Sequence, residues 1–198
     1  MSGIEQAVEA LAQGRMIIIT GDRLRGGDID FAIAARHVTA DTINFMASHG
    51  RGLICLAMRP ERAVKLGISL INPGAERQSG RPFGRSIEAR TGVGTGISAA
   101  DRAETIRVAM AAESTGDDLV SPGHVFPLIG APGGARERAA AAEASIELCS
   151  LAHAGDMAVI CSIMRDDGEM ARIDDLDALI ARRAIPVADI AALLDRLG

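Results

Sequence analysis

The stretch INFMASHGRGLICLAM (residues 43–58) contains the change of structure on which the fold depends. Its first part belongs to the segment Thr39–Ser48, which predicts a helix. Its last part, Gly52–Met58, is a nearly continuous apolar run of strand length, which is typical of a buried strand. The stretch therefore predicts a helix followed closely by a buried strand, as in folds that layer helices on a sheet.

The residues before this stretch predict a helix, a strand and a loop. Ser2 and Glu5 form a capping-box pattern, and the apolar residues that follow predict an amphipathic helix ending near Gly14. The β-branched run Met16–Thr20 predicts a strand. The glycines and charges of Gly21–Asp30 predict a loop.

The residues after the stretch continue the alternation, although imperfectly. We expect helices at Pro60–Leu66, from Ser98 to about Ala112, and at Arg136–Leu151, a strand at Met157–Met164, a surface loop at Asn72–Gly84 and two short helices at the end. Several short strands among these helices favour α/β or α+β layering over a helical bundle or a β-sandwich. A length of 198 residues predicts one domain covering 1–198.

Composition excludes several kinds of partner. Lys and Arg total 21 against 26 Asp and Glu, and no basic cluster is interleaved with aromatics, so we expect no nucleic acid partner. The apolar runs are far shorter than the roughly 20 residues of a membrane span. With no signal-peptide pattern at the N-terminus, we expect a cytoplasmic protein that does not contact the membrane. Three cysteines without a CxxC pair indicate reduced thiols.

Five runs in order resemble the 3,4-dihydroxy-2-butanone 4-phosphate synthase family of riboflavin biosynthesis. They are GRM (14–16), INFMASHGRGLICLAM (43–58), GTGISAADRAETIR (94–107), SPGHVFPL (121–128) and MRDDGEMAR (164–172). The resemblance runs from about residue 4 to the C-terminus with almost no shift in spacing. It implies a three-layer α/β (α+β) sandwich in a single domain, and a homodimer with sites near the subunit interface.

The resemblance also implies a magnesium site, and this chain departs from it at both ligand positions. The family's first ligand is a Glu directly after an Arg, and Gly26 stands there; the second is a His, and Ala141 stands there. Neither side chain has a donor for a hard cation. We therefore expect no metal and no other cofactor, with Mg²⁺ or Mn²⁺ only if the family reaction survives.

Three further positions have lost family residues. Ala142 replaces a Thr, Ser162 a Glu, and Ser121 an Arg. A reaction that develops negative charge needs a cation or preorganised donors, and removing one strong oxyanion donor costs about 3–4 kcal/mol. The residues lost therefore argue against the family reaction.

Eight residues remain as candidates for a site, and six of them match positions of the family's site, the exceptions being Thr95 and Ser98. Arg25 and Arg138 match its substrate-facing arginines, and Thr95 and Ser98 stand where a turn enters a helix, so these four are expected to bind an anion. The candidate catalytic residues are Asp28, Asp30, His124 and Cys55. Each has a plainer alternative: solvated carboxylates, a histidine bonded to backbone, a buried thiol acting as a small hydrophobe, and for Ser98 a helix cap.

Three functions remain open, and we expect the first of them. It is a divergent, metal-independent lyase-type enzyme that acts by proton transfer on a small anionic hydroxyketone or related polar acid. The second is a genuine synthase that converts ribulose 5-phosphate to 3,4-dihydroxy-2-butanone 4-phosphate and formate. The third is a non-catalytic homologue that binds a ligand or a partner subunit.

Two predictions about variants follow from this reasoning. Gly26→Glu together with Ala141→His should raise the affinity for magnesium, while either alone should do little, because a cation held by one carboxylate stays mostly hydrated. Arg138→Ala should weaken anion binding with little effect on the melting temperature.

Overall fold

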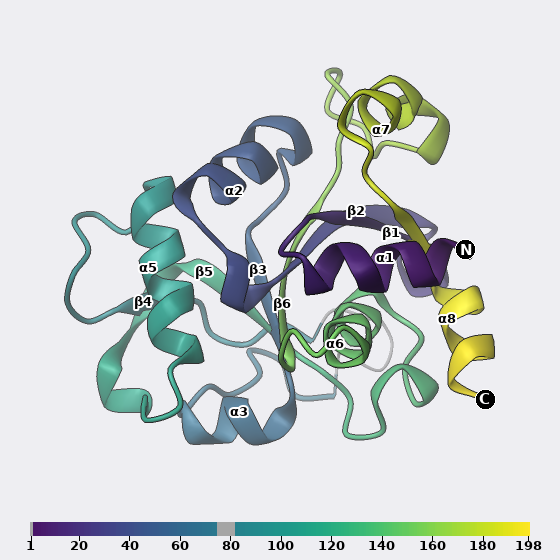
Figure 1. Cartoon of the computed structure of the whole chain (residues 1–198). Coiled ribbons are helices and arrows are strands. Elements are labelled where there is room, and N and C mark those ends of the chain that lie inside the picture. Colours follow the sequence, from purple (N-terminus) through teal and green to yellow (C-terminus); the bar gives the residue numbers. More distant parts are fainter. Residues whose placement is uncertain (1, 75–81) are drawn as a thin grey trace.

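The computed structural model describes residues 2–74 and 82–198 (Figure 1). Its main helices are α1 (Gly3–Ala12), α2 (Ala40–Phe45), α3 (Pro60–Lys65), α5 (Ala99–Met110), α6 (Ala141–Leu151), α7 (Asp177–Arg183) and α8 (Ile190–Leu197). Its strands are β1 (Ile17–Asp22), β2 (Asp28–Ala34), β3 (Cys55–Met58), β4 (Ile87–Ala89), β5 (Leu119–Ile129), β6 (Met157–Ser162) and β7 (Val187–Asp189). Most of the surface loop expected at Asn72–Gly84 lies outside the described residues.

Within the described ranges, seven strands form one mixed sheet in the order β4-β5-β3-β6-β2-β1-β7. β3 pairs with β5 and β1 with β7 in parallel, and the other neighbouring strands are antiparallel. Helices cover both faces of this sheet (Figure 1). The expected three-layer α/β architecture is therefore confirmed.

The two faces of the central strands carry side chains of different size. Phe31 and Ile33 of β2 point into a core shared with α2, α3 and α5, whereas Ala32 and Ala34 point into a second core shared with α1, α6 and α8. This follows from the two-residue period of a strand. Small residues on the second face let the alanine-rich helix α6 approach the sheet closely.

Several expected elements are confirmed, with shifted ends. Ser2 and Glu5 do form a capping box at α1, and Ser98 caps α5, its Oγ accepting from the Asp101 N–H at 3.0 Å. The expected loop at Gly21–Asp30 is wrong at both ends, because β1 continues to Asp22 and β2 begins at Asp28 and pairs with β1 and β6. β4, β5 and β7 were not expected at all, since each is completed by pairing with a strand distant in sequence.

The helix expected at Arg136–Leu151 begins only at Ala141. Ala140 has extended dihedrals (φ −126°, ψ 164°), and a short 3₁₀ turn, η5 (Gly134–Arg136), precedes it. Arg138 therefore lies in an irregular segment rather than on the helix. The helix preference of alanine was overridden here by tertiary contacts, which are stronger than a propensity of a few tenths of a kcal/mol per residue.

No helix in the described part of the chain has both the length and the apolar character that a membrane span requires.

Candidate functional site

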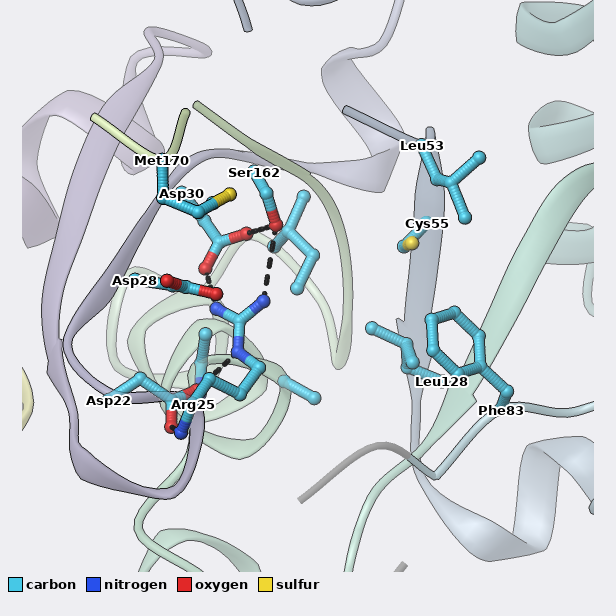
Figure 2. A pocket seen from close by; sticks show the side chains of 13 residues that line it. Asp22, Arg25, Asp28, Asp30, Leu53, Cys55, Phe83, Leu128, Ser162 and Met170 are labelled. Carbon is cyan, nitrogen blue, oxygen red and sulfur yellow. Dashed lines mark hydrogen bonds and ion pairs between the residues drawn. The ribbon is translucent and has the colours of Figure 1, made fainter. Parts of the chain in front are cut away.

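A cavity of about 310 Å³ lies where β1, β2, β3 and β6 meet the first turn of α6. Polar groups form one side of it and apolar side chains form the other, as Figure 2 shows. The polar side consists of Asp22, Arg25, Asp28, Asp30 and Ser162. The apolar side includes Leu53, Cys55, Phe83 and Leu128.

A tight connection between β1 and β2 brings the polar residues together. Asp22 ends β1 and accepts a hydrogen bond from the Arg25 backbone N–H at 3.2 Å, which begins the 3₁₀ turn η1 (Arg23–Arg25). Gly26 and Gly27 follow with φ of 69° and 83°, a region that glycine adopts without steric cost. The chain thereby reverses direction and enters β2 at Asp28.

The Arg25 guanidinium is the centre of the polar side. Its Nε donates to Asp22 Oδ2 at 2.9 Å, its Nη1 donates to Ser162 Oγ at 3.1 Å, and its Nη2 donates to Asp30 Oδ2. Ser162 in turn donates to Asp30 Oδ1 at 2.7 Å. One cation thus holds two carboxylates and a hydroxyl in a closed network.

This network is shielded from solvent. The side chains of Asp22 and Asp30 are each 1% exposed, and that of Arg25 is 13% exposed. Burial raises the pKa of Asp30, against the opposing effects of Arg25 and Ser162. The pKa of Arg25 is raised: burial alone would lower it, but Asp30 and then Asp22 outweigh that effect. Arg25 therefore remains charged at any pH at which the protein is folded.

Asp28 is the carboxylate of the cavity that Arg25 does not bind. Its side chain is 14% exposed, and its nearest cation is Arg172, 3.8 Å away and 57% exposed. That separation is a weak, partly solvated ion pair. Asp28 is therefore the carboxylate of the polar side most available to a ligand.

The first turn of α6 closes the cavity through Asp22. Ala140 at the N-cap has no side chain that could cap the helix. Instead Asp22 Oδ2 accepts from the Ala141 N–H at 2.9 Å and satisfies one of the free donors of the helix end. Ala141 and Ala142 consequently face the cavity with methyl groups.

Cys55 lies on the apolar side, 7% exposed. Burial raises the pKa of its thiol, and the charge of Asp30 raises it further. A thiol that stays protonated is a poor nucleophile. This environment favours the small-hydrophobe alternative over a catalytic thiol.

Arg138 lies outside this cavity, and its guanidinium forms hydrogen bonds with other groups of the protein. Its Nε donates to Glu143 Oε1 at 2.7 Å, and its Nη2 donates to the Ile129 carbonyl at 2.9 Å and to Glu143. The Glu143 side chain is fully buried and that of Arg138 is 10% exposed. The expectation that Arg138→Ala would hardly change the melting temperature is therefore revised, because that change leaves a buried carboxylate unpaired.

The remaining candidates lie near the β4–β5 edge. His124 of β5 contacts Glu88 of β4. Thr95 belongs to the turn before α5, where the Gly94 and Gly96 N–H groups donate to Asp101 at 3.2 and 3.0 Å. Those two donors are thus already occupied. Within a single chain, four of the eight candidates line the same cavity: Arg25, Asp28, Asp30 and Cys55. The other four, His124, Thr95, Ser98 and Arg138, do not line it. The roles assigned to all eight residues stay predictions.

The donors present do not fit a preformed magnesium site. Among the described residues, no three His, Cys, Asp or Glu side chains are grouped so as to hold a metal ion. Both oxygens of Asp22 and both of Asp30 already accept hydrogen bonds. Gly26 and Ala141, at the positions of the family's ligands, contribute no donor.

The sequence analysis missed Asp22, Glu88 and Glu143. Asp22 had a detectable signal, because it is an acidic residue of the Gly21–Asp30 loop, the loop that also carries Asp28 and Asp30 and that resembles the family's metal-binding loop. Glu143 had a signal as well, because it stands two residues after Ala141, where the family run that carries the second ligand also has a Glu. Glu88 had none, since it contacts His124 only after β4 and β5 have paired.

Comparison with known proteins gives a consistent result. Residues 5–196 match the family model described as 3,4-dihydroxy-2-butanone 4-phosphate synthase. A protein of that name from Pseudomonas aeruginosa is 42% identical over 98% of this chain and 53% of its own length. Another from Agrobacterium fabrum is 38% identical over 98% of this chain and 91% of its own. The chain spans about half the length of the first curated relatives it matches.

Solved structures agree. A two-domain 3,4-dihydroxy-2-butanone 4-phosphate synthase from A. baumannii superimposes with a TM-score of 0.90 at 40% identity, covering 97% of this chain and 56% of that one. A 3,4-dihydroxy-2-butanone 4-phosphate synthase in complex with two magnesium ions superimposes with a TM-score of 0.91 at 31% identity, covering 100% and 97%.

Proposed function

This chain belongs to the 3,4-dihydroxy-2-butanone 4-phosphate synthase family, and from that premise we propose that it converts ribulose 5-phosphate to 3,4-dihydroxy-2-butanone 4-phosphate and formate. The observation that carries the proposal is identity of about 40%, over nearly the whole chain, to proteins named for that activity. The reaction divides five carbons into four and one, so formate is a direct readout.

The first expectation of the sequence analysis, a divergent metal-independent enzyme acting on another substrate, is corrected by these comparisons. Relatives of similar identity and near-complete coverage are named as the synthase, including one that this chain matches over 91% of its length. Loss of individual site residues was a weaker guide than similarity across the whole chain. The genuine synthase, which was the second possibility, is better supported.

The cavity supplies groups that suit an oxygen-rich substrate. Arg25 uses three of its five N–H groups in the network and offers the remaining two as donors, and Asp28 offers a carboxylate that can accept hydrogen bonds from substrate hydroxyls. The apolar side excludes water from the opposite wall. In this proposal these residues bind and orient the sugar, and no step is assigned to a metal ion, because the donors do not fit one.

His124 is the candidate for proton transfer. Because it does not line the cavity of its own chain, the proposal must also explain how it reaches the substrate. β3 and β5 pair in parallel with Cys55 opposite Phe126. If this register is continued two residues toward the N-terminus, it would place His124 opposite Leu53, a residue at the cavity wall. His124 itself does not line the cavity and its side chain is 42% exposed. We propose that a homodimer completes the site, with His124 acting at its interface.

Complementation between variants tests this arrangement. Asp28→Asn and His124→Gln should each be nearly inactive alone. If His124 acts on the cavity of the other subunit, mixing the two after mild dissociation should restore part of the activity, because some heterodimers contain one intact site. Mixtures that remain inactive, although exchange is shown by mass spectrometry, would place both residues in one subunit's site.

The function itself is tested by carbon NMR with ¹³C-labelled ribulose 5-phosphate, with and without magnesium. We expect labelled formate from the wild type and at least about a hundredfold less from His124→Gln, the lower end of what general acid–base catalysis contributes. Asp166→Asn, which alters a 93% exposed carboxylate outside the cavity, is the matched control and should keep full activity. A folded wild type that releases no formate under either condition refutes the proposal.

One observation favours a second candidate function, a homologue that binds a sugar phosphate without converting it. In the Arg25 network every oxygen of Asp22 and Asp30 already accepts a hydrogen bond, so the network needs no substrate to satisfy its carboxylates. Calorimetry distinguishes the two candidates. Binding of ribulose 5-phosphate with unchanged substrate after long incubation supports the second.

A further inference from the structure

β4 and β5 lie side by side at one end of the sheet (Figure 1). There Glu88 of β4 and His124 of β5 form a close pair. Glu88 Oε2 lies 2.6 Å from His124 Nδ1, within the range of a strong hydrogen bond. The two side chains differ in exposure, 15% for Glu88 against 42% for His124. The carboxylate is thus held inside the protein while the imidazole extends toward solvent.

Two glycines make this approach possible. A Cβ on Gly96 would lie 1.7 Å from Glu88 Oε2, and a Cβ on Gly123 would lie 2.1 Å from the backbone carbon of Ile87. Real Cβ atoms do not approach other atoms so closely, so any other residue at these positions would displace Glu88 or the strand that carries it. Gly96 also has φ of 82°, which favours glycine independently.

The turn that contains Gly96 is itself fixed. Asp101 accepts from the N–H groups of Gly94 and Gly96, and its own N–H donates to Ser98. The turn before α5 is therefore held by its own hydrogen bonds, and it packs closely against the Glu88 carboxylate at Gly96. Segments around residues 88, 96 and 124, which are separated in sequence, converge on one contact.

We propose that Glu88 is the positioning residue of His124. A carboxylate facing Nδ1 stabilises the tautomer with the proton on that nitrogen, and it leaves Nε2 unprotonated and directed away from Glu88. Nε2 is then the nitrogen available to accept a proton from a substrate. The catalytic consequence rests on the proposed function, but the tautomer and the orientation do not.

Nitrogen-15 NMR of histidine-labelled protein tests the pairing directly. The chain has four histidines, so the His124 signals are assigned by their loss in His124→Gln. At a pH at which the imidazole is neutral, we expect the wild type to show the proton on Nδ1. Glu88→Leu should shift His124 to the Nε2-protonated tautomer that free imidazole side chains prefer. Glu88→Gln, which keeps an acceptor, should shift it only in part.

A pair of glycine variants tests the geometry without altering either partner. Gly96→Ala should reproduce the tautomer change of Glu88→Leu, because its methyl group occupies the place of the carboxylate. Gly92→Ala is the matched control: its φ is 81°, but the nearest atoms to its Cβ belong to the Glu104 side chain, at an ordinary contact distance of 3.4 Å or more. It should leave the His124 signals unchanged even if it lowers stability.

The activity readout separates positioning from folding. Glu88→Leu should lower kcat by up to about 100-fold, because a His124 in the wrong tautomer loses part of what general base catalysis contributes, while KM changes little. A wild-type His124 protonated on Nε2, or the same tautomer in wild type and Glu88→Leu, overturns the proposal. If the NMR result holds but the wild type releases no formate, the pairing stands and the proposed function fails.

Discussion

Replacing Arg25 by methionine should destabilise the protein strongly, because it leaves two buried carboxylates without a cation. Asp22 and Asp30 are each 1% exposed and both depend on the Arg25 guanidinium. Removing one partner of a buried ion pair typically costs about 3–5 kcal/mol. For a chain of this length, that free energy corresponds to a fall in Tm of roughly 6–20 °C.

The direction of the pH dependence follows from Asp30. Burial already raises its pKa, and without Arg25 nothing of comparable strength opposes that effect. A carboxyl whose pKa is higher in the folded than in the unfolded state keeps its proton on folding. Stability is therefore lost as the pH rises from the unfolded value, about 3.9, through the folded value. Arg25→Met should be more destabilised, relative to wild type, at pH 8 than at pH 5.

Urea denaturation at the two pH values measures both effects. Arg23→Met, a change of an exposed arginine in the same turn, is the control and should stay within about 0.5 kcal/mol of wild type. Adding Asp22→Asn and Asp30→Asn to Arg25→Met should recover part of the loss, because no buried charge then remains unpaired. A loss below about 1 kcal/mol that does not vary with pH would falsify the view that these carboxylates are desolvated.

Four other outcomes are expected. Arg138→Ala should lower the free energy of unfolding by about 3–5 kcal/mol, because it leaves Glu143 buried and unpaired; a melting temperature equal to wild type contradicts this. The double variant Gly26→Glu/Ala141→His should bind magnesium more tightly than wild type or either single variant, as measured by calorimetry. Equal affinity in wild type, both single variants and the double variant would contradict the view that these two positions are the lost metal ligands. Hydrogen bonds from the Gly94 and Gly96 N–H groups lower the pKa of Asp101. The difference in Tm between wild type and Asp101→Asn should therefore be largest at neutral pH and should shrink as the pH falls below about 3.9. A difference in Tm that does not change with pH would contradict this. Cys55 should resist alkylation by iodoacetamide at pH 8 in the native state, and rapid labelling detected by mass spectrometry would show a reactive thiolate instead.

The part of the site that could be predicted from sequence is the part that is local. The Asp22-to-Asp30 segment carries its own turn glycines and charges, so its role as a functional loop could be expected before its fold was known. Its last three residues proved to belong to strand β2, because β2 pairs with β6, which lies about 130 residues away in sequence. Hydrogen bonds to a distant strand leave no trace in the local pattern.

The charge balance of the site could not be predicted at all. Considered one at a time in the sequence, Arg25 is predicted to bind an anionic ligand and Asp30 is predicted to act as a catalytic base. In the folded protein Arg25 pairs with both Asp22 and Asp30, and Ser162 completes the network from the neighbouring strand β6. Similarly, Arg138 suggests a free cation in the sequence, but it is committed to Glu143 in the structure.

The sequence by itself determined the layered α/β class, the capped ends of α1 and α5, and the family, because periodicity, capping residues and ordered runs are all properties of neighbouring or regularly spaced positions. Only the tertiary structure decided which charges are satisfied and which remain available. It paired Glu88 with His124, closed the Arg25 network and left Asp28 as the accessible carboxylate. Electrostatic roles depend on distance and burial in three dimensions, and a linear order of residues specifies neither.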